Sequence, residues 1–282
     1  MILFKKAADL RNWLDVQEEK GNAIGFVPTM GALHSGHISL IAYSRLANPL
    51  TVCSIFVNPT QFNDASDFEK YPITIENDIR LLEEAGCDVL FLPSVKEMYP
   101  GGANPAMHYD LGYLETVLEG KFRPGHFQGV CMVVQRLLEI TQPSNLYLGQ
   151  KDYQQCMVIT KLVELMGSSK KINVTICPTL REPDGLAMSS RNMRLNKEER
   201  EKAVTISRVL DFIIAAIRPG DLSLLKQEAY AKLEQAGFRV DYVAIAGASD
   251  LSPVDDWDGK QKLVALVAAF MNEVRLIDNM LL

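Results

Sequence analysis

The sequence predicts an α/β protein whose larger part is built on a parallel sheet, and two observations support this fold class. Short apolar runs rich in β-branched residues alternate with longer segments of helical periodicity along the first two thirds of the chain. These runs are apolar without interruption, which is typical of strands that are covered by helices on both faces. A chain of 282 residues is also long enough for a large core and for two domains.

The elements of the sheet can be placed in order. The predicted strands fall at residues 23–27, 51–57, 88–92, 145–149 and 172–177. Between them, residues 75–85 repeat apolar positions with helical spacing and end at a glycine. Parallel strands present their carboxyl ends at one edge of the sheet, where ligands bind in Rossmann-like folds. Polar motifs directly follow three of these strands, so we expect them at that edge: His34, the pair Asn58 and Gln61, and Lys151.

The pattern changes after residue 177. Residues 178–185 are rich in proline and glycine and form a predicted hinge. Beyond it we expect helices at residues 196–217 and 222–236 and strands at residues 240–246, 263–270 and 274–277. The sequence therefore predicts a larger domain at residues 1–177 and a small α+β domain at residues 178–282 that can close as a lid.

Composition excludes several classes of protein. A formal net charge of −6 argues against a nucleic-acid partner, which requires a basic face. The five cysteines form no Cys-x-x-Cys pair, which is typical of reduced core thiols in a cytoplasmic protein. We find no signal-peptide segment and no apolar run long enough to span a bilayer, so we expect no membrane partner.

A histidine pair, His34-Ser35-Gly36-His37, stands at the start of a predicted helix. The first helical turn offers N–H groups and the positive end of the helix dipole, which favour phosphate. Two imidazoles one turn apart can also bind zinc, but no nearby Cys, Asp or Glu completes such a site. A pair that only caps the helix would leave the flanking glycines unexplained.

A second motif for an anionic ligand lies at Ser189, Ser190 and Arg191. Two hydroxyls and a guanidinium in one short loop can converge on a triphosphate. Alone, this triplet is usually an ordinary turn or a helix cap. In this order after the histidine pair, it resembles the second signature loop of class I adenylate-forming enzymes.

Five stretches together resemble the pantoate–β-alanine ligase family. They are residues 27–37, 54–62, 123–127, 149–155 and 188–191, and the resemblance continues to residues 275–279. Many family members carry an acidic residue where this chain has Ser35, and Glu where it has Gln150. The resemblance implies an ATP-dependent ligase that condenses (R)-pantoate with β-alanine through a pantoyl-adenylate. The products would be AMP, pyrophosphate and pantothenate, a precursor of coenzyme A, and the enzyme would be a cytoplasmic homodimer that uses Mg²⁺.

The resemblance also implies site residues. Catalysis would rest on His34, His37 and Lys151, and pantoate would be bound by Gln61, Gln155 and Asn58. Asp78 would contact Mg²⁺, which is held mainly by the ATP phosphates. The residues expected to bind ATP are Met30, Gly31, Ala32, Leu33, His34, Ser35, Gly36, His37, Gly149, Gln150, Lys151, Asp152, Leu186, Ala187, Met188, Ser189, Ser190 and Arg191.

The chemistry of carboxylate activation fits these roles. Imidazoles can stabilise charge on the α-phosphoryl group, while Lys151 and the loop at residues 189–191 neutralise the departing pyrophosphate. A neutral amide holds a carboxylate without blunting its attack, so Gln61 and Gln155 suit pantoate. The alternative for Lys151 is a solvated surface lysine without a role in catalysis. The alternative for Gln61 and Gln155 is that both are ordinary exposed glutamines in loops. Arg123 and His126 belong to one of the stretches of the resemblance, and His126 is expected to order its loop rather than to act in the chemistry.

Two other functions use similar motifs. A nucleotidyltransferase would need a further basic cluster for the phosphate of its substrate, and the sequence offers none. A nucleotide-binding module without catalysis would not need Lys151 or the paired glutamines.

Overall fold

The computed structural model describes residues 1–62, 65–102 and 108–282, which fold as two compact units. The first unit comprises Met1–Gly149 and Gln155–Pro178, and the second comprises Gln150–Gln154 and Thr179–Leu282. The second unit therefore includes five residues that, in the sequence, fall between two segments of the first unit. The predicted domains had placed these five residues with the sheet.

The first unit is built on a six-stranded sheet in which every pair of neighbours is parallel. Its strand order is β1-β4-β3-β2-β5-β6. The strands are β1 (Ile2–Phe4), β2 (Ile24–Thr29), β3 (Leu50–Ile55), β4 (Val89–Phe91), β5 (Asn145–Gly149) and β6 (Asn173–Cys177). The predicted parallel sheet is confirmed, and the structure adds the edge strand β1. The order reverses beside β2, which has β3 on one side and β5 on the other, and ligands bind at such switch points.

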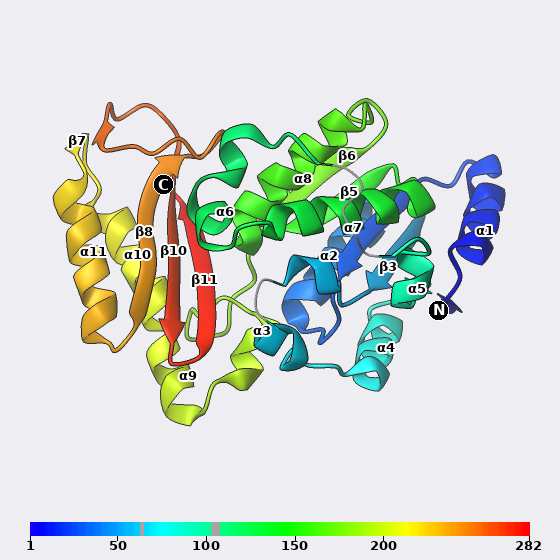
Figure 1. The fold of residues 1–282 in the computed structure, drawn as a ribbon, viewed down its shortest axis with the longest axis horizontal. Coiled ribbons are helices and arrows are strands. Elements are labelled where there is room, and N and C mark those ends of the chain that lie inside the picture. The colour runs from blue at the N-terminus through cyan, green and yellow to red at the C-terminus, as the bar shows by residue number, and fades with distance from the viewer. Residues whose placement is uncertain (63–64, 103–107) are drawn as a thin grey trace. The chain divides into compact units, whose positions relative to one another are not determined.

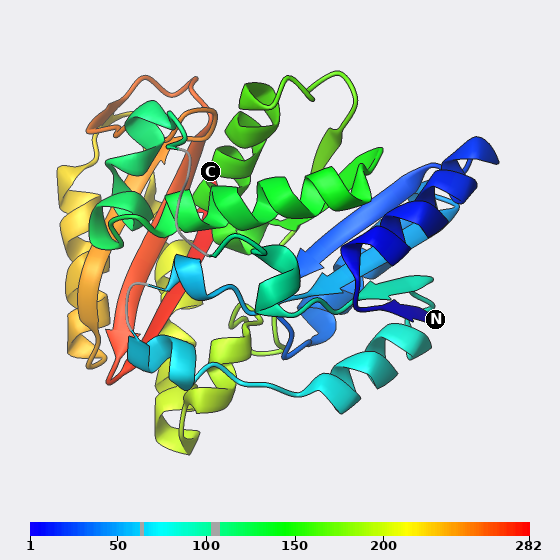
Figure 2. The same ribbon diagram turned by 45° about the vertical axis from the view of Figure 1, so that its right-hand side comes forward.

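Helices cover both faces of this sheet (Figures 1 and 2). On one face, α1 (Ala7–Glu19), α7 (His126–Thr141) and α8 (Tyr153–Leu165) contribute apolar residues to a single core. On the other face, α2 (Ser35–Ala47) and α4 (Ile75–Glu84) pack Ile41 and Leu82 against Cys53 of the sheet. This burial on both sides explains why the strands read as continuous apolar runs. The shorter elements are η1 (Pro59–Gln61), α3 (Ala65–Glu69), α5 (Val95–Met98), η2 (Gly112–Glu115) and α6 (Leu118–Phe122).

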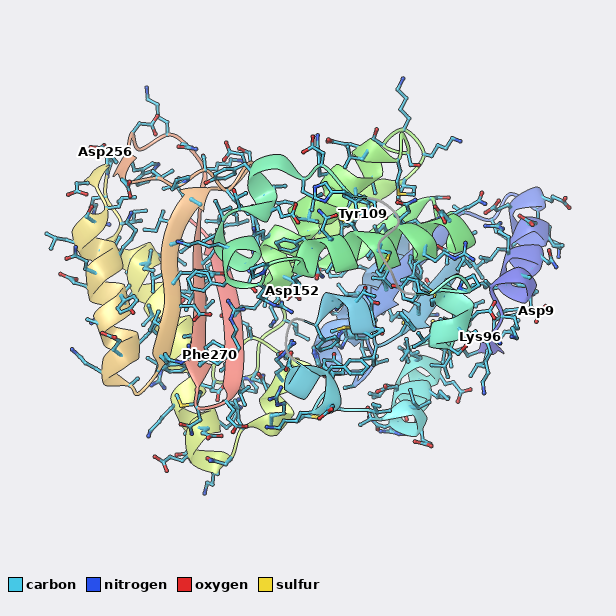
Figure 3. The ribbon with its side chains drawn as sticks, in the orientation of Figure 1. Asp9, Lys96, Tyr109, Asp152, Asp256 and Phe270 are labelled. Atoms are coloured by element: carbon cyan, nitrogen blue, oxygen red, sulfur yellow. The ribbon has the colours of Figure 1, made fainter. Side chains whose placement is uncertain are left out.

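The second unit is a small α+β fold. Its main sheet is antiparallel in the order β11-β10-β8, and α10 and α11 pack on it around Leu210, Leu233 and Val267 (Figure 1). Figure 3 labels Phe270 on this sheet, where it stacks under the Arg239 guanidinium at 3.9 Å. The elements are η3 (Gln150–Asp152), η4 (Ser190–Arg194), α9 (Lys197–Ala203), α10 (Thr205–Ala216), β7 (Gly220–Asp221), α11 (Ser223–Gln235), β8 (Arg239–Gly247), β9 (Asp256–Trp257), β10 (Leu263–Met271) and β11 (Val274–Leu281).

Two element predictions for this unit were wrong in extent. The helix expected at residues 196–217 is broken at Val204, whose N–H bonds to the carbonyl of Lys202 and so leaves the helical ladder. The last strand, expected at residues 274–277, continues to Leu281. The prediction stopped early because Asp278 and Asn279 are polar, yet both are buried in the strand.

All five cysteines are buried as free thiols, and all lie in the first unit. Burial raises the pKa of Cys87 and Cys131 to about 12 and that of Cys177 to about 11. These thiols therefore remain protonated near neutral pH. Within the residues described, no helix is both long and apolar enough to cross a membrane.

Candidate functional site

The loop at residues 28–37, here called the histidine loop, leaves the carboxyl end of β2 with two successive left-handed residues. Gly31 has φ +84° and Ala32 has φ +48°, an uncommon conformation for a residue with a side chain. This backbone turns the N–H groups of Ala32 and Leu33 toward one point, a nest that binds an anion. The anion is the carboxylate of Asp78, at 2.9 Å from Ala32 N and 2.8 Å from Leu33 N.

Asp78 holds the histidine loop in shape from α4. Its side chain is fully buried and also accepts a hydrogen bond of 2.9 Å from the Thr74 hydroxyl. Both carboxylate oxygens are thus bonded within the protein, and the contact of Asp78 with Mg²⁺ stays a prediction. Among the described residues, no three His, Cys, Asp or Glu side chains cluster as a metal site would require.

His34 and His37 form a reciprocal cap at the start of α2. His34 Nδ1 accepts the N–H of Gly36 at 3.1 Å, and His37 Nδ1 accepts the N–H of His34 at 3.3 Å. A ring nitrogen that accepts a hydrogen bond carries no proton, so the remaining nitrogen, Nε2, carries it in both neutral rings. The pair thus caps the helix, and the same cap makes each Nε2–H a donor.

The turn at residues 58–61, here called the glutamine turn, follows β3. Asn58 was predicted to bind pantoate, but its side chain is 1 % exposed and its bonds are internal. Its amide donates to Gly129 O at 3.1 Å and to Gln61 Oε1 at 3.3 Å, and its oxygen accepts the Tyr99 hydroxyl at 2.8 Å. Asn58 therefore orients Gln61 through this bond, and its own contact with pantoate stays a prediction. Gln61 Nε2 lies 2.8 Å from the Met30 sulfur, so the structure brings the glutamine turn and the histidine loop together.

Helix α7 fixes the glutamine turn from the other side. His126 is buried, and its Nδ1 lies 2.8 Å from Gln61 O, while Nε2 lies 3.1 Å from an Arg123 nitrogen. Since Arg can only donate, the proton of His126 is on Nδ1 and is donated to Gln61 O. A Cβ added at Gly129 would come 2.2 Å from Thr60 O, so only glycine allows this approach. These contacts agree with the expected loop-ordering role of His126.

The turn at residues 149–152, here called the lysine turn, carries Lys151 and follows β5. Its residues from Gln150 onward belong to the second unit. Asn279 donates from Nδ2 to Gln150 O at 2.9 Å and to Lys151 O at 2.8 Å. Lys151 Nζ lies 3.8 Å from Asp152, which Figure 3 labels in this turn.

The loop at residues 186–191, here called the serine loop, is the other predicted ATP segment of the second unit. Ser189 caps η4 by accepting the N–H of Arg191 at 3.3 Å. A short hairpin precedes the loop, and Arg181 closes it with a bond of 3.1 Å to Gly185 O. Arg181 also pairs with Asp278 at 2.6 Å and 3.0 Å.

No role for Asp278 or Asn279 was predicted from the sequence. The only available signal was their position inside residues 275–279, the final stretch of the resemblance. Gln155 lies in the first turn of α8 and is partly exposed, and its binding of pantoate stays a prediction.

Comparison with known proteins places these features in a family. The family model described as pantoate-beta-alanine ligase matches residues 2–281. The pantothenate synthetase of Cytophaga hutchinsonii is 43 % identical over 285 aligned residues, which cover 100 % of this chain and 99 % of the relative. That of Acetivibrio thermocellus is 44 % identical, with coverage of 100 % and 99 %.

Solved structures agree with this placement. The pantothenate synthetase of Thermus thermophilus superposes with a TM-score of 0.90 at 41 % identity, covering 99 % of each chain. The pantoate-beta-alanine ligase of Francisella tularensis, solved with beta-gamma ATP and β-alanine, has a TM-score of 0.83 at 39 % identity. Its match covers 100 % of this chain and 97 % of that protein.

Proposed function

Since this chain belongs to the pantoate–β-alanine ligase family, we propose how its own residues carry out the reaction of that family. The chain is an enzyme that uses ATP to form a C–N bond between pantoate and β-alanine, giving pantothenate. The full-length match, from residue 2 to residue 281, is the observation that carries this conclusion. The roles of individual residues below are proposals.

We propose that the reaction proceeds through a pantoyl-adenylate. A carboxylate does not condense with an amine at neutral pH because oxide is a poor leaving group. Attack of the pantoate carboxylate on the α-phosphorus of ATP expels pyrophosphate and leaves an acyl group with AMP as its leaving group. The β-alanine amine then attacks the acyl carbon, and AMP departs.

The histidine loop is proposed to stabilise the first transition state. Each imidazole of His34 and His37 carries its proton on Nε2, because Nδ1 is engaged in the helix cap. Two fixed donors at a helix N-terminus suit the charge that develops on the α-phosphoryl oxygens. Their orientation is set before ATP binds, so little reorganisation is needed during the reaction.

The β and γ phosphates are assigned to Lys151 and to Ser189, Ser190 and Arg191. A cationic ammonium and guanidinium, with two hydroxyl donors, neutralise a departing pyrophosphate. The described residues offer no cluster of metal ligands, so we propose that Mg²⁺ is held by the phosphates of ATP. There it would neutralise part of the phosphate charge.

Pantoate is assigned to Gln61 and Gln155, whose neutral amides leave the carboxylate nucleophilic. In this arrangement Asn58, Tyr99 and His126 act behind Gln61 by fixing its side chain and its backbone carbonyl. We further propose that the enzyme works as a cytoplasmic homodimer, which sedimentation velocity on the purified chain would test.

Pyrophosphate exchange tests the proposed order of steps. With pantoate present and β-alanine absent, labelled pyrophosphate should exchange into ATP. Adding β-alanine should then release AMP and pyrophosphate in equal amounts with pantothenate. Exchange that strictly requires β-alanine would rule out a free adenylate step. A product that retained the nucleotidyl group would indicate a nucleotidyltransferase, and ATP binding without turnover would indicate a nucleotide-binding module.

A further inference from the structure

The lysine turn is held by one side chain from β11, the last strand of the second unit. Asn279 of β11 is 2 % exposed. Its Nδ2 group donates both of its hydrogens, one to Gln150 O at 2.9 Å and one to Lys151 O at 2.8 Å. Its Oδ1 accepts the Gln150 side chain at 3.3 Å. One amide therefore fixes two successive carbonyls of the turn, and with them the direction in which Lys151 leaves the backbone.

Asn279 is itself fixed by its neighbours. Its N–H donates to Asp278 Oδ1 at 2.8 Å, and its carbonyl accepts an Arg181 nitrogen at 3.3 Å. Arg181 grips the carboxylate of Asp278 with two bonds of 2.6 Å and 3.0 Å, a geometry that only a planar guanidinium provides. Because all three side chains sit on or against β11, the amide of Asn279 has little freedom to turn.

The same cluster also holds the segment that leads to the serine loop. Arg181 donates to Gly185 O at 3.1 Å, inside the hairpin that precedes residues 186–191. Two consecutive residues of β11 thus connect to both segments assigned to the triphosphate. A site that must hold reacting groups within a fraction of an ångström needs this kind of support, since small displacements cost large factors in rate.

We propose that Asn279 is a positioning residue for the ligase reaction, which orients the lysine turn so that Lys151 faces the departing pyrophosphate. This inference rests on the proposed assignment of Lys151 to the triphosphate. Asn279 does not touch the reactants in this scheme. Its effect on the rate passes through Lys151, so the two residues must be coupled.

A double-mutant cycle measures that coupling. Adenylate formation is followed in single turnovers with ATP and pantoate, with β-alanine withheld. Lys151→Ala should slow this step about 100-fold, as expected for loss of a charge that acts in the transition state. Asn279→Ala should slow it about tenfold, through displacement of the turn, and leave the KM for pantoate unchanged. In the Lys151→Ala background, Asn279→Ala should change the rate by less than about twofold, because the ammonium group that Asn279 positions is absent.

A second variant and a matched control separate positioning from folding. Asn279→Ser keeps one donor, so its adenylation rate should lie between those of the wild type and Asn279→Ala. This variant allows the same test if Asn279→Ala does not fold. Asn48→Ala removes another buried asparagine, which donates to Ser44 O at 2.8 Å and to the Tyr147 hydroxyl at 2.7 Å. Asn48 ends α2, beside the start of β3 and away from the histidine loop. That variant should lose thermal stability but keep the adenylation rate.

The failures are distinguishable. If Asn279→Ala slows the Lys151→Ala enzyme by the same factor as the wild type, Asn279 acts independently of Lys151 and the positioning role is overturned, while the proposed function stands. Unchanged adenylation in folded Asn279→Ala would overturn it equally. If Lys151→Ala itself adenylates at the full rate, the assignment of Lys151 fails, and the positioning role fails with it.

Discussion

The histidine loop and the lysine turn are held in place in different ways. In the histidine loop, the two imidazoles hold their own helix start through bonds that span two or three residues. In the lysine turn, the backbone of Gln150 and Lys151 is held by Asn279, which lies 128 residues from Lys151 in the sequence. The histidine cap is local and can be recognised as a pattern, although Asp78 of α4 also holds this loop from 45 and 46 residues away. The support of the lysine turn depends on the complete antiparallel sheet of its unit. It cannot be recognised from the residues near Lys151 in the sequence.

The largest expected effect tests the local arrangement. His34→Ala or His37→Ala should lower turnover by roughly two to three orders of magnitude, the scale of losing one transition-state donor. Each should also lose about 1 kcal/mol of stability with the cap. His34→Asn and His37→Asn are matched controls, because Asn Oδ1 can replace His Nδ1 as the capping acceptor, whereas no atom of Asn reaches the position of the imidazole Nε2–H. They should recover stability but not turnover, as measured by steady-state kinetics and urea unfolding.

Two results would contradict this account. Near-normal turnover in the alanine variants would remove both histidines from the chemistry. Recovery of turnover by His34→Asn or His37→Asn would make the pair structural only.

The next effect concerns the nest around Asp78. Asp78→Asn replaces one carboxylate oxygen with an amide nitrogen, whose hydrogens would face a backbone N–H group. The charge-assisted hydrogen bonds from Ala32 N and Leu33 N are then weakened or lost. We expect a loss of about 2–3 kcal/mol in stability and roughly tenfold lower turnover, because the loop that carries the histidines relaxes. Thr74→Val removes one bond to Asp78 and leaves its two bonds to backbone N–H groups, so its effect should be smaller. A titration with Mg²⁺ is decisive, since turnover restored by high Mg²⁺ would support the predicted role of Asp78 as a metal ligand.

A smaller effect is expected at the pantoate end. Gln155→Ala should raise the apparent KM for pantoate roughly tenfold by leaving polar groups of the substrate unpaired, with ATP binding almost intact. Gly129→Ala should have a similar result by another route, since its Cβ would meet Thr60 O and displace the glutamine turn. Steady-state kinetics with each substrate varied would measure both. Weaker ATP binding with unchanged pantoate binding would reverse the assignment of the site.

The last prediction separates the two units by pH. Thiols whose folded-state pKa is raised to about 11 or 12 keep protons that the unfolded chain, near the ordinary value of 9.0, releases. Stability should therefore be complete below pH 9 and fall above it, by at most about 1.4 kcal/mol per pH unit for each thiol. All five thiols are in the first unit.

Tryptophan fluorescence can report each unit separately, since Trp13 lies in α1 and Trp257 in β9. In the variants Trp257→Phe and Trp13→Phe, urea unfolding at pH 8 and pH 10 under reducing conditions would follow one unit at a time. The transition reported by Trp13 should move to lower urea at pH 10. A larger shift of the Trp257 transition would contradict the role of the thiols.

The sequence predicted those parts of the molecule that repeat a local pattern. The apolar runs marked β2 to β6, and the glycine after residue 85 marked the end of α4. The three-residue strand β1 was missed because it is too short for a periodicity. The internal bonds of Asp78 and Asn58 could not be predicted, because in the sequence a carboxylate or amide near a ligand-binding edge looks the same whether it faces substrate or backbone. Only the structure shows that their polar atoms are already bonded.

The division of the chain has a consequence for how this enzyme can be taken apart or exchanged between relatives. Residues 150–154 belong to the second unit, although the chain on both sides of them belongs to the first. A gene fragment for residues 179–282 would encode Asn279 but not the turn that Asn279 holds. A fragment for residues 1–178 would encode Lys151 without the strand that supports it. Neither unit is a portable module, so recombination at the hinge would preserve both cores and still separate Lys151 from its support.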